Sequence, residues 1–166
     1  MRMKVISCIC AAFLNIGSAT AMPVDMTTDR FLDICDAPNV QAAALKGDQL
    51  GWQRLTKAET EEWRSNFLNY NGGSVDVVGW PRERKARSDS MSFWVAVGPN
   101  AHKACAYSTA RPGGWLDALS ARLGEPDTLD KDDTVEVISA SWTRGTVEYS
   151  FAQAGSSASI TIAAKR

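Results

Sequence analysis

The segment MSFWVAVG, residues 91–98, decides the fold of this chain. Large apolar side chains occupy every second position of it, at Met91, Phe93, Val95 and Val97. Successive side chains of a β-strand point to opposite faces of a sheet, so this alternation predicts a strand with one apolar face. Trp94 falls in the other phase, and we therefore expect its ring on the face that lies away from this apolar row.

The same two-residue period returns along the chain and predicts a sheet of about six strands. The six longer expected strands are 74–80, 91–98, 102–109, 135–143, 146–153 and 158–165, and a further short strand is expected at 51–55. Residues 81–90 are expected to form a charged loop. Only Arg144 and Gly145 separate two of the strands, which is the length of a tight hairpin turn, so the sheet is expected to be mainly antiparallel.

Apolar residues at helical spacing predict the helices of the fold. The expected helices cover residues 27–36, 38–47, 56–71 and 115–123. Trp63 and Trp115 lie on the apolar stripes of the last two helices, and both are expected in the core. The sequence thus predicts an α+β domain in which three to four helices pack on one face of the sheet.

Residues 1–21 have the three parts of a secretory signal peptide. Arg2 and Lys4 form a positive start, residues 5–16 are an apolar run, and Ala-Thr-Ala at 19–21 is a small-residue cleavage site. The apolar run is shorter than the roughly 20 residues that span a membrane, so we expect no stable membrane insertion. Cleavage would leave residues 22–166 as a single domain, periplasmic or secreted.

Cys35 and Cys105 are the two cysteines that remain after residue 21. An even number of cysteines in an oxidising compartment favours a disulfide. The alternative, a reactive thiol or a metal ligand, lacks a nearby histidine motif. The sequence therefore predicts a structural Cys35–Cys105 bridge.

The charge balance and the motifs narrow the function classes. Without residues 1–21 the chain has 16 basic and 19 acidic residues, a net charge of −3, and nucleic acid is not expected as a partner because its binding depends on positive charge. No phosphate-binding glycine motif occurs, and no cofactor or metal is expected. Residues 127–136 are rich in aspartate but lack the central glycine of a calcium loop, so we expect a solvated loop there.

His102 is the only histidine, and it is the one residue on which an enzyme hypothesis could rest. A hydrolase would need a serine brought close to His102 by folding. The chain has no Gly-x-Ser-x-Gly motif, so no catalytic residue can be named from the sequence. A hydrolase centred on His102 is therefore kept as an alternative function.

The candidate binding residues are aromatic and basic side chains around the expected 81–90 loop. They are Trp80, Arg82, Arg84, Lys85, Arg87 and Trp94. Tryptophan and arginine dominate the energetics of protein interfaces, so this grouping indicates a partner-binding surface. In the alternative interpretation, the N-terminal helices cover Trp94 and the charged segment is an ordinary solvated hairpin connection.

The segment LSARLGEP, residues 119–126, ends a helix in Leu-Gly-x-Pro and is followed by an expected strand meander. This unit resembles the helix-plus-meander unit of small outer-membrane-assembly lipoproteins and of secreted β-lactamase inhibitor proteins. The spacing of Cys35, Trp52, Trp63, Cys105 and Trp142 resembles that of small exported proteins of Gram-negative bacteria with no assigned activity. The resemblance implies no catalytic residues, and the chain lacks the lipoprotein lipid-attachment cysteine.

These patterns predict an exported, non-enzymatic binding or accessory module of the bacterial envelope. Its partner would be another protein or an envelope polymer. Besides the hydrolase hypothesis, a second alternative is a structural envelope protein that the Cys35–Cys105 disulfide stabilises.

Overall fold

The computed structural model describes residues 24–84 and 87–165. The expected signal peptide and Lys85 lie outside the described residues. The elements in chain order are α1 (Thr28–Cys35), α2 (Val40–Gly47), the 3₁₀ turn η1 (Asp48–Leu50), α3 (Glu61–Asn71), β1 (Ser74–Arg84), β2 (Arg87–Val97), β3 (His102–Thr109), α4 (Trp115–Leu123), β4 (Thr128–Asp132), β5 (Val137–Arg144), β6 (Val147–Ala154) and β7 (Ser157–Lys165).

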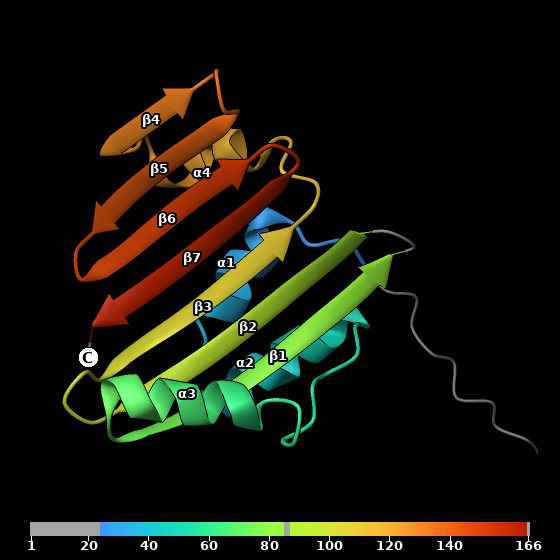
Figure 1. The fold of residues 1–166 in the computed structure, drawn as a ribbon, viewed down its shortest axis with the longest axis vertical. Coiled ribbons are helices and arrows are strands. Elements are labelled where there is room, and N and C mark those ends of the chain that lie inside the picture. The colour runs from blue at the N-terminus through green and yellow to red at the C-terminus, as the bar shows by residue number, and fades with distance from the viewer. Residues whose placement is uncertain (1–23, 85–86, 166) are drawn as a thin grey trace, which may run out of the picture.

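Within the described residues, the strands form one antiparallel sheet in the order β1-β2-β3-β7-β6-β5-β4. The last strand of the chain inserts beside β3, so the β1–β3 meander and the β4–β7 meander join into a continuous sheet (Figure 1). The predicted α+β class and antiparallel sheet are confirmed. The strand count is seven rather than about six.

The sheet has two faces with different coverings, which we call the inner and the outer face. The inner face bears Phe93, Cys105 and Ile162, which pair across β2, β3 and β7, and it packs against α1, α2 and α4. Helix α3 lies on the opposite, outer face, where its Trp63 contacts Trp94 (Figure 1). The prediction that the helices share one face is therefore correct for three of the four described helices and wrong for α3.

The core lies between the inner face and helices α1, α2 and α4, and aromatic rings fill it. Its largest fully buried side chains are Trp80, Trp142, Tyr107, Phe31 and Phe93. Trp115 is buried as predicted, and its ring lies 5.0 Å from that of Tyr107. The prediction for Trp63 was wrong, because its side chain is 40% exposed.

Local capping signals set several helix ends. Thr27 caps α1 by accepting from the backbone N–H of Arg30, and Asn39 caps α2, so this helix starts after Pro38 rather than at it. The capping box forms as predicted, because Thr56 and Glu59 bond each other's backbone N–H groups. A turn follows it, however, and the regular helix begins only at Glu61.

Three segments differ from the expected pattern. Residues 81–84 and 87–90 are strand rather than loop, because β1 and β2 extend through them to the Arg84–Arg87 pair; Pro81 is tolerated because β1 is an edge strand. Residues 128–132, expected as a solvated loop, form the exposed edge strand β4, whose charges oppose pairing with another chain. Residues 51–55 are not a strand, although the Leu55 N–H donates to the Gly79 carbonyl of β1 at 2.8 Å.

Candidate functional site

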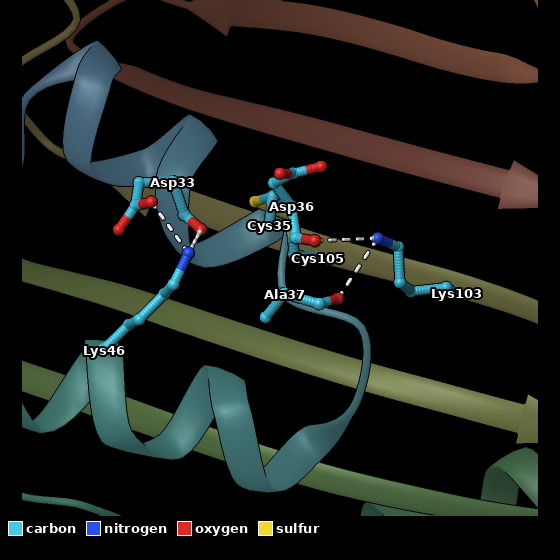
Figure 2. The surroundings of a disulfide bond; sticks show 7 residues. All are labelled: Asp33, Cys35, Asp36, Ala37, Lys46, Lys103 and Cys105. Atoms are coloured by element: carbon cyan, nitrogen blue, oxygen red, sulfur yellow. Dashed lines mark hydrogen bonds and ion pairs between the residues drawn. A yellow bond between two sulfur atoms is a disulfide. The ribbon is translucent and has the colours of Figure 1, made fainter.

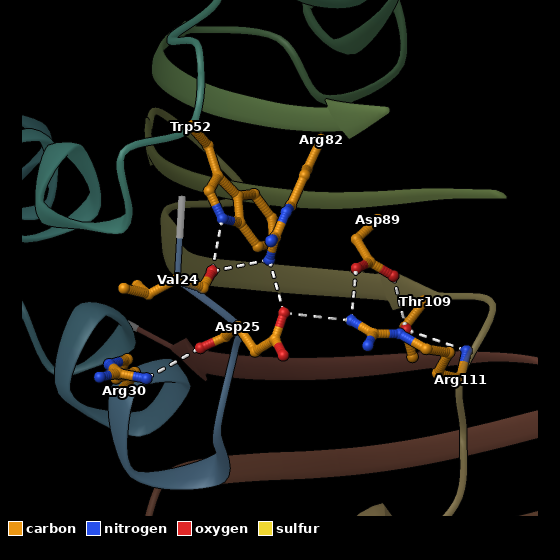
Figure 3. Close-up of polar contacts among 8 residues, drawn as sticks. All are labelled: Val24, Asp25, Arg30, Trp52, Arg82, Asp89, Thr109 and Arg111. Carbon is orange, nitrogen blue, oxygen red and sulfur yellow. Dashed lines mark hydrogen bonds and ion pairs between the residues drawn. The ribbon is translucent and has the colours of Figure 1, made fainter. Parts of the chain in front are cut away.

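Arg82, one of the predicted binding residues, is a structural anchor. Its guanidinium donates to the Val24 carbonyl and to the Asp25 carboxylate, both at 2.8 Å. The same guanidinium lies 5.4 Å from the ring centre of Trp52, whose indole N–H also donates to the Val24 carbonyl (Figure 3). Arg82 therefore binds residues 24–25 to β1, and its guanidinium charge is used in contacts within the protein.

A chain of alternating charges continues from Asp25 along the same edge of the inner face. The Arg111 guanidinium bridges Asp25 at 3.5 Å and Asp89 at 3.3 Å (Figure 3). Asp89 is only 3% exposed, and the Thr109 hydroxyl donates to it at 2.7 Å. Burial raises the pKa of the neighbouring Tyr107 hydroxyl, which a hydrogen bond with Thr109 partly offsets. In this network each buried charge has an oppositely charged partner. We therefore assign the network a structural role rather than a ligand-binding one.

Trp80 is a core residue and not a surface contact. Its side chain has no exposed area, and its indole N–H donates to the Asp48 carboxylate at 3.0 Å. Gly47 of α2 packs directly on the Trp80 ring, where even a methyl group would collide with it. The period-two pattern puts Trp80 in register with Met91, and therefore on the inner face beneath α2.

The other two basic residues that the structure describes lie at the end of the β1–β2 hairpin. Arg84 and Arg87 form its last described backbone pair, and Lys85 lies outside the described residues. The structure thus brings Arg84 and Arg87 together but separates them from Trp94, which lies in the middle of β2. Trp80 and Arg82 therefore do not belong to a surface shared with the other predicted binding residues.

Trp94 lies on the outer face, as its phase in β2 predicts, and an aromatic cluster surrounds it. The Trp63 ring of α3 lies 5.6 Å from it, edge to face, and stacks in turn on Phe67. The Trp94 indole N–H donates to Nε2 of His102 at 3.0 Å. Helix α3 thus covers Trp94 in part, which agrees with the alternative that an N-terminal helix lies over it.

The hydrogen bonds of His102 fix the roles of both its ring nitrogens. An indole N–H can only donate, so Nε2 accepts from Trp94; a carbonyl can only accept, so Nδ1 donates to Asn100 at 2.8 Å. A hydrolase base needs a nucleophile or a carboxylate at these positions. Among the described residues, the hydrogen-bond partners of His102 are an indole and a backbone carbonyl, and this geometry gives the hydrolase hypothesis no support.

Small side chains cover the part of the outer face that lies beyond α3. Two cross-strand rows make it up, Ser92–Ala106–Thr161–Ser150–Ser141 and Ser90–Ser108–Ser159–Ala152–Ser139. None of these ten residues is buried, and no helix lies over this part of the face in Figure 1. Trp63 of α3, which is 40% exposed and contacts Trp94, stands beside it. We refer to the two rows as the small-residue surface.

Sequence reasoning missed the small-residue surface, although a signal for it was present. In β2, β3, β5, β6 and β7, the phase that alternates with the apolar residues contains mostly serine, alanine or threonine, with Glu148 and Lys165 as long charged exceptions near one end of the sheet. The registers that align these phases depend on strand order, so the signal becomes a surface only in the folded sheet.

The predicted disulfide is present between Cys35 at the end of α1 and Cys105 of β3 (Figure 2). Next to it, the Lys103 ammonium donates to the carbonyls of Asp36 and Ala37, at 3.4 and 3.2 Å. Lys46 of α2 forms an ion pair with Asp33 of α1 at 2.7 Å. The covalent and polar links together fix α1 to the inner face.

Across residues 24–84 and 87–165, no helix has the length and apolar character needed to cross a bilayer. In the same residues, no group of three or more His, Cys, Asp or Glu side chains is arranged to hold a metal ion. Comparison with protein families, curated proteins and solved structures finds no match to this chain. The resemblance of residues 119–126 to envelope-assembly and inhibitor proteins thus stays a prediction.

Proposed function

We propose that this protein is an exported, non-enzymatic binding module of the bacterial envelope, and that its partner lies on the outer face of the sheet. The partner is another protein or an envelope polymer. One observation carries the proposal: the small-residue surface is an extended sheet face with no helix over it, bordered by the partly exposed side chain of Trp63.

The chemistry of this surface suits a long, flat partner. Side chains of one to three heavy atoms let a partner's backbone approach the sheet closely, and each serine or threonine hydroxyl can both donate and accept a hydrogen bond. Trp63 at the border supplies the large aromatic area that anchors many interfaces. The proposed contact surface therefore keeps the sheet face that bears Trp94, as expected from the sequence, but combines it with α3 rather than with the 81–90 segment.

The Trp94–His102 hydrogen bond stabilises the position of Trp63 at the border of the small-residue surface. It fixes the Trp94 ring, and Trp63 packs against that ring edge to face. Phe67 extends the same contact, with its ring 5.7 Å from that of His102. Trp63 is thus held in a defined place beside the small-residue surface, although much of its area is exposed.

Site-specific photocrosslinking tests the location of the contact. A benzoylphenylalanine at Ser150 of the small-residue surface is compared with one at Asp117, an exposed residue of α4 on the inner-face side. The probes are isolated peptidoglycan sacculi and, separately, a periplasmic protein fraction. We expect adducts from position 150 with one of the two probes and none from position 117.

Surface variants test the same proposal without a crosslinker. Ser150→Arg puts a long charged side chain into the small-residue surface, and Trp63→Ala removes its aromatic border. Ser156→Arg, in the exposed turn between β6 and β7, is the matched control. We expect the first two to weaken co-sedimentation or capture at least about fivefold, the effect of roughly 1 kcal/mol. Equal binding by all three variants would remove the outer face from the proposal.

The alternative of a disulfide-stabilised structural envelope protein rests on the Cys35–Cys105 bond. Such a protein would depend on this bond for its stability and tolerate Ser150→Arg without loss of function. Export itself is tested by cell fractionation with mass spectrometry. A shortened chain beginning near residue 22, without free thiols, is expected in the periplasm or the medium.

A further inference from the structure

A groove of about 440 Å³ follows the open edge of β1, with a helix on either side of it. Helix α2 contacts β1 on the inner face, and α3 contacts it on the outer face (Figure 1). The lining includes Val77 and Val78 of β1, Leu45 of α2, Leu55 and Arg64 of α3. The volume falls in the range of ligand sites. No residue of the groove belongs to the small-residue surface.

The backbone of β1 presents an unpaired residue to this groove. The Leu55 N–H donates to the Gly79 carbonyl at 2.8 Å, and the Arg64 guanidinium donates to the Val75 carbonyl at 3.5 Å. The backbone groups of residues 75 and 79 therefore point away from β2. Because this direction repeats every second residue of a strand, the N–H and C=O of Val77 point the same way. Among the described residues, neither group of Val77 has a hydrogen-bond partner.

The unpaired part of the edge is short. Arg64 occupies the edge at Val75 and Leu55 occupies it at Gly79, which leaves about 13 Å of strand between the two points. The edge strand of a second folded domain would bring its own sheet and covering layers, which α2 and α3 obstruct. A single extended segment of about three residues fits this length without such a conflict.

The walls of the groove define the side chains of such a segment. A peptide residue that pairs with Val77 points its side chain to the outer side, and its two neighbours point theirs to the inner side. One neighbour lies opposite Val78 and beside Leu45, whose side chain is 73% exposed. An aliphatic side chain placed there would cover Leu45, which is favourable.

The charges around the groove have no net sign that would select a ligand. Four of them form two pairs, Arg54–Asp48 at 2.7 Å and Arg64–Glu61 at 3.9 Å. The other two are Lys57, which lines the groove, and Asp76, which precedes Val77. Their charges are opposite, so the groove favours recognition through the peptide backbone rather than through charge.

We infer that the β1 edge binds an extended, uncharged peptide segment of a partner protein, which adds to the sheet at Val77. The backbone of the segment pairs with the N–H and C=O of Val77, as in other complexes in which a peptide extends a sheet. An aliphatic residue beside the paired one lies against Leu45. This inference does not rest on the proposed outer-face contact, because it concerns another part of the molecule.

N-methylated peptides test the backbone pairing on the full chain in its oxidised form. The probe is acetyl-Val-Ser-Val-amide, and two analogues are methylated on the amide nitrogen of the serine or of the second valine. Binding is followed by NMR shifts of the Val77 amide and the Leu45 methyl groups. Only every second N–H of a strand faces its neighbour, so one methylation should weaken binding about fivefold and the other should have little effect.

Variants assign the contact to its residues. Val77→Pro removes the unpaired N–H and should abolish binding, and the strand should tolerate it because Pro81 already occupies the same phase of β1. Leu45→Ser should weaken binding of the unmethylated probe. The matched control is Leu129→Ser on β4, where the side chain is also exposed. Thermal melts establish that each variant is folded.

Several results would overturn the inference. They are equal binding of all three peptides, equal loss with both methylations, binding that survives Val77→Pro, and equal effects of Leu45→Ser and Leu129→Ser. A Val77 amide shift that depends on protein concentration in the absence of peptide would also overturn it, because the edge would then pair with a second copy of the chain.

Discussion

Opening the Cys35–Cys105 disulfide is the perturbation whose effect the structure defines most sharply. The bond joins residues 70 apart and links α1 to β3, an interior strand of the sheet. It can be removed by reduction, which leaves both sulfur atoms in place, or by the double substitution Cys35→Ala/Cys105→Ala. Both cysteines are buried, so the second change also removes packing volume from the core.

The magnitude follows from the length of the closed loop. In the chain-entropy account, a link across about 70 residues restricts the unfolded chain enough to stabilise the folded state by about 4 kcal/mol. For a domain of about 150 residues, each kcal/mol moves the melting temperature by roughly 2–4 °C. Reduction should therefore lower it by about 8–16 °C. The double substitution should cost somewhat more, because two small cavities are added.

Urea unfolding with and without a non-thiol reductant measures the effect. The midpoint should fall by about 2 M if the slope m is about 2 kcal/mol/M. The slope itself should rise on reduction, because the unlinked unfolded chain exposes more surface. The Cys35→Ala/Cys105→Ala variant is the control, since reductant should not change its midpoint.

Two results would refute this reasoning. A loss of less than about 1 kcal/mol on reduction would mean that the link does not restrict the unfolded chain as its loop length requires. A large loss with an unchanged slope would place the effect in the folded state, through the contacts that join α1 to β3, rather than in the unfolded chain. Neither result would bear on the prediction of export, which cell fractionation tests separately.

Two further perturbations follow from local geometry. Gly47→Ala should destabilise by about 1–3 kcal/mol in urea unfolding, although alanine favours helices, because the methyl group collides with the Trp80 ring; a gain in stability would contradict this packing. The backbone N–H of Thr143 and the Arg144 guanidinium lower the pKa of Asp127. Its contribution is therefore present above the ordinary carboxyl pKa near 4 and is lost as the pH falls through the lowered value, so Asp127→Asn should reduce stability at pH 7 but not at pH 2; an equal reduction at both would be evidence against the linkage.

Much of the secondary structure followed from local patterns. The alternation at 91–97 and at 147–151 specifies strands because successive side chains must point to opposite faces, whatever the rest of the chain does. Helix α4 begins and ends as predicted, because an apolar stripe and a terminal glycine are properties of a few consecutive residues. The Cys35–Cys105 bridge was predictable on the expectation of export, because removal of residues 1–21 would leave two cysteines and a single intramolecular pairing.

The candidate site was predicted only in part, because side-chain exposure depends on non-local neighbours. Trp63 and Trp80 were both assigned from local pattern, and the structure reverses them: Trp80 lies under α2, and Trp63 lies on a helix over the outer face. Arg82 has the composition of an interface residue, yet its partner is Asp25, 57 residues earlier in the chain. A sequence pattern that spans a few residues cannot predict a contact between residues so far apart in the chain.

The sequence by itself determined where most of the strands and helices form, which two cysteines pair and that one face of the sheet is apolar. Only the tertiary structure decided that β7 inserts beside β3, that α3 lies on the opposite face from the other three helices, and that the small residues of five strands line up into one surface. The physical reason is range: backbone geometry and periodicity act over a few residues, whereas register, helix placement and exposure are set by contacts between segments far apart in the chain.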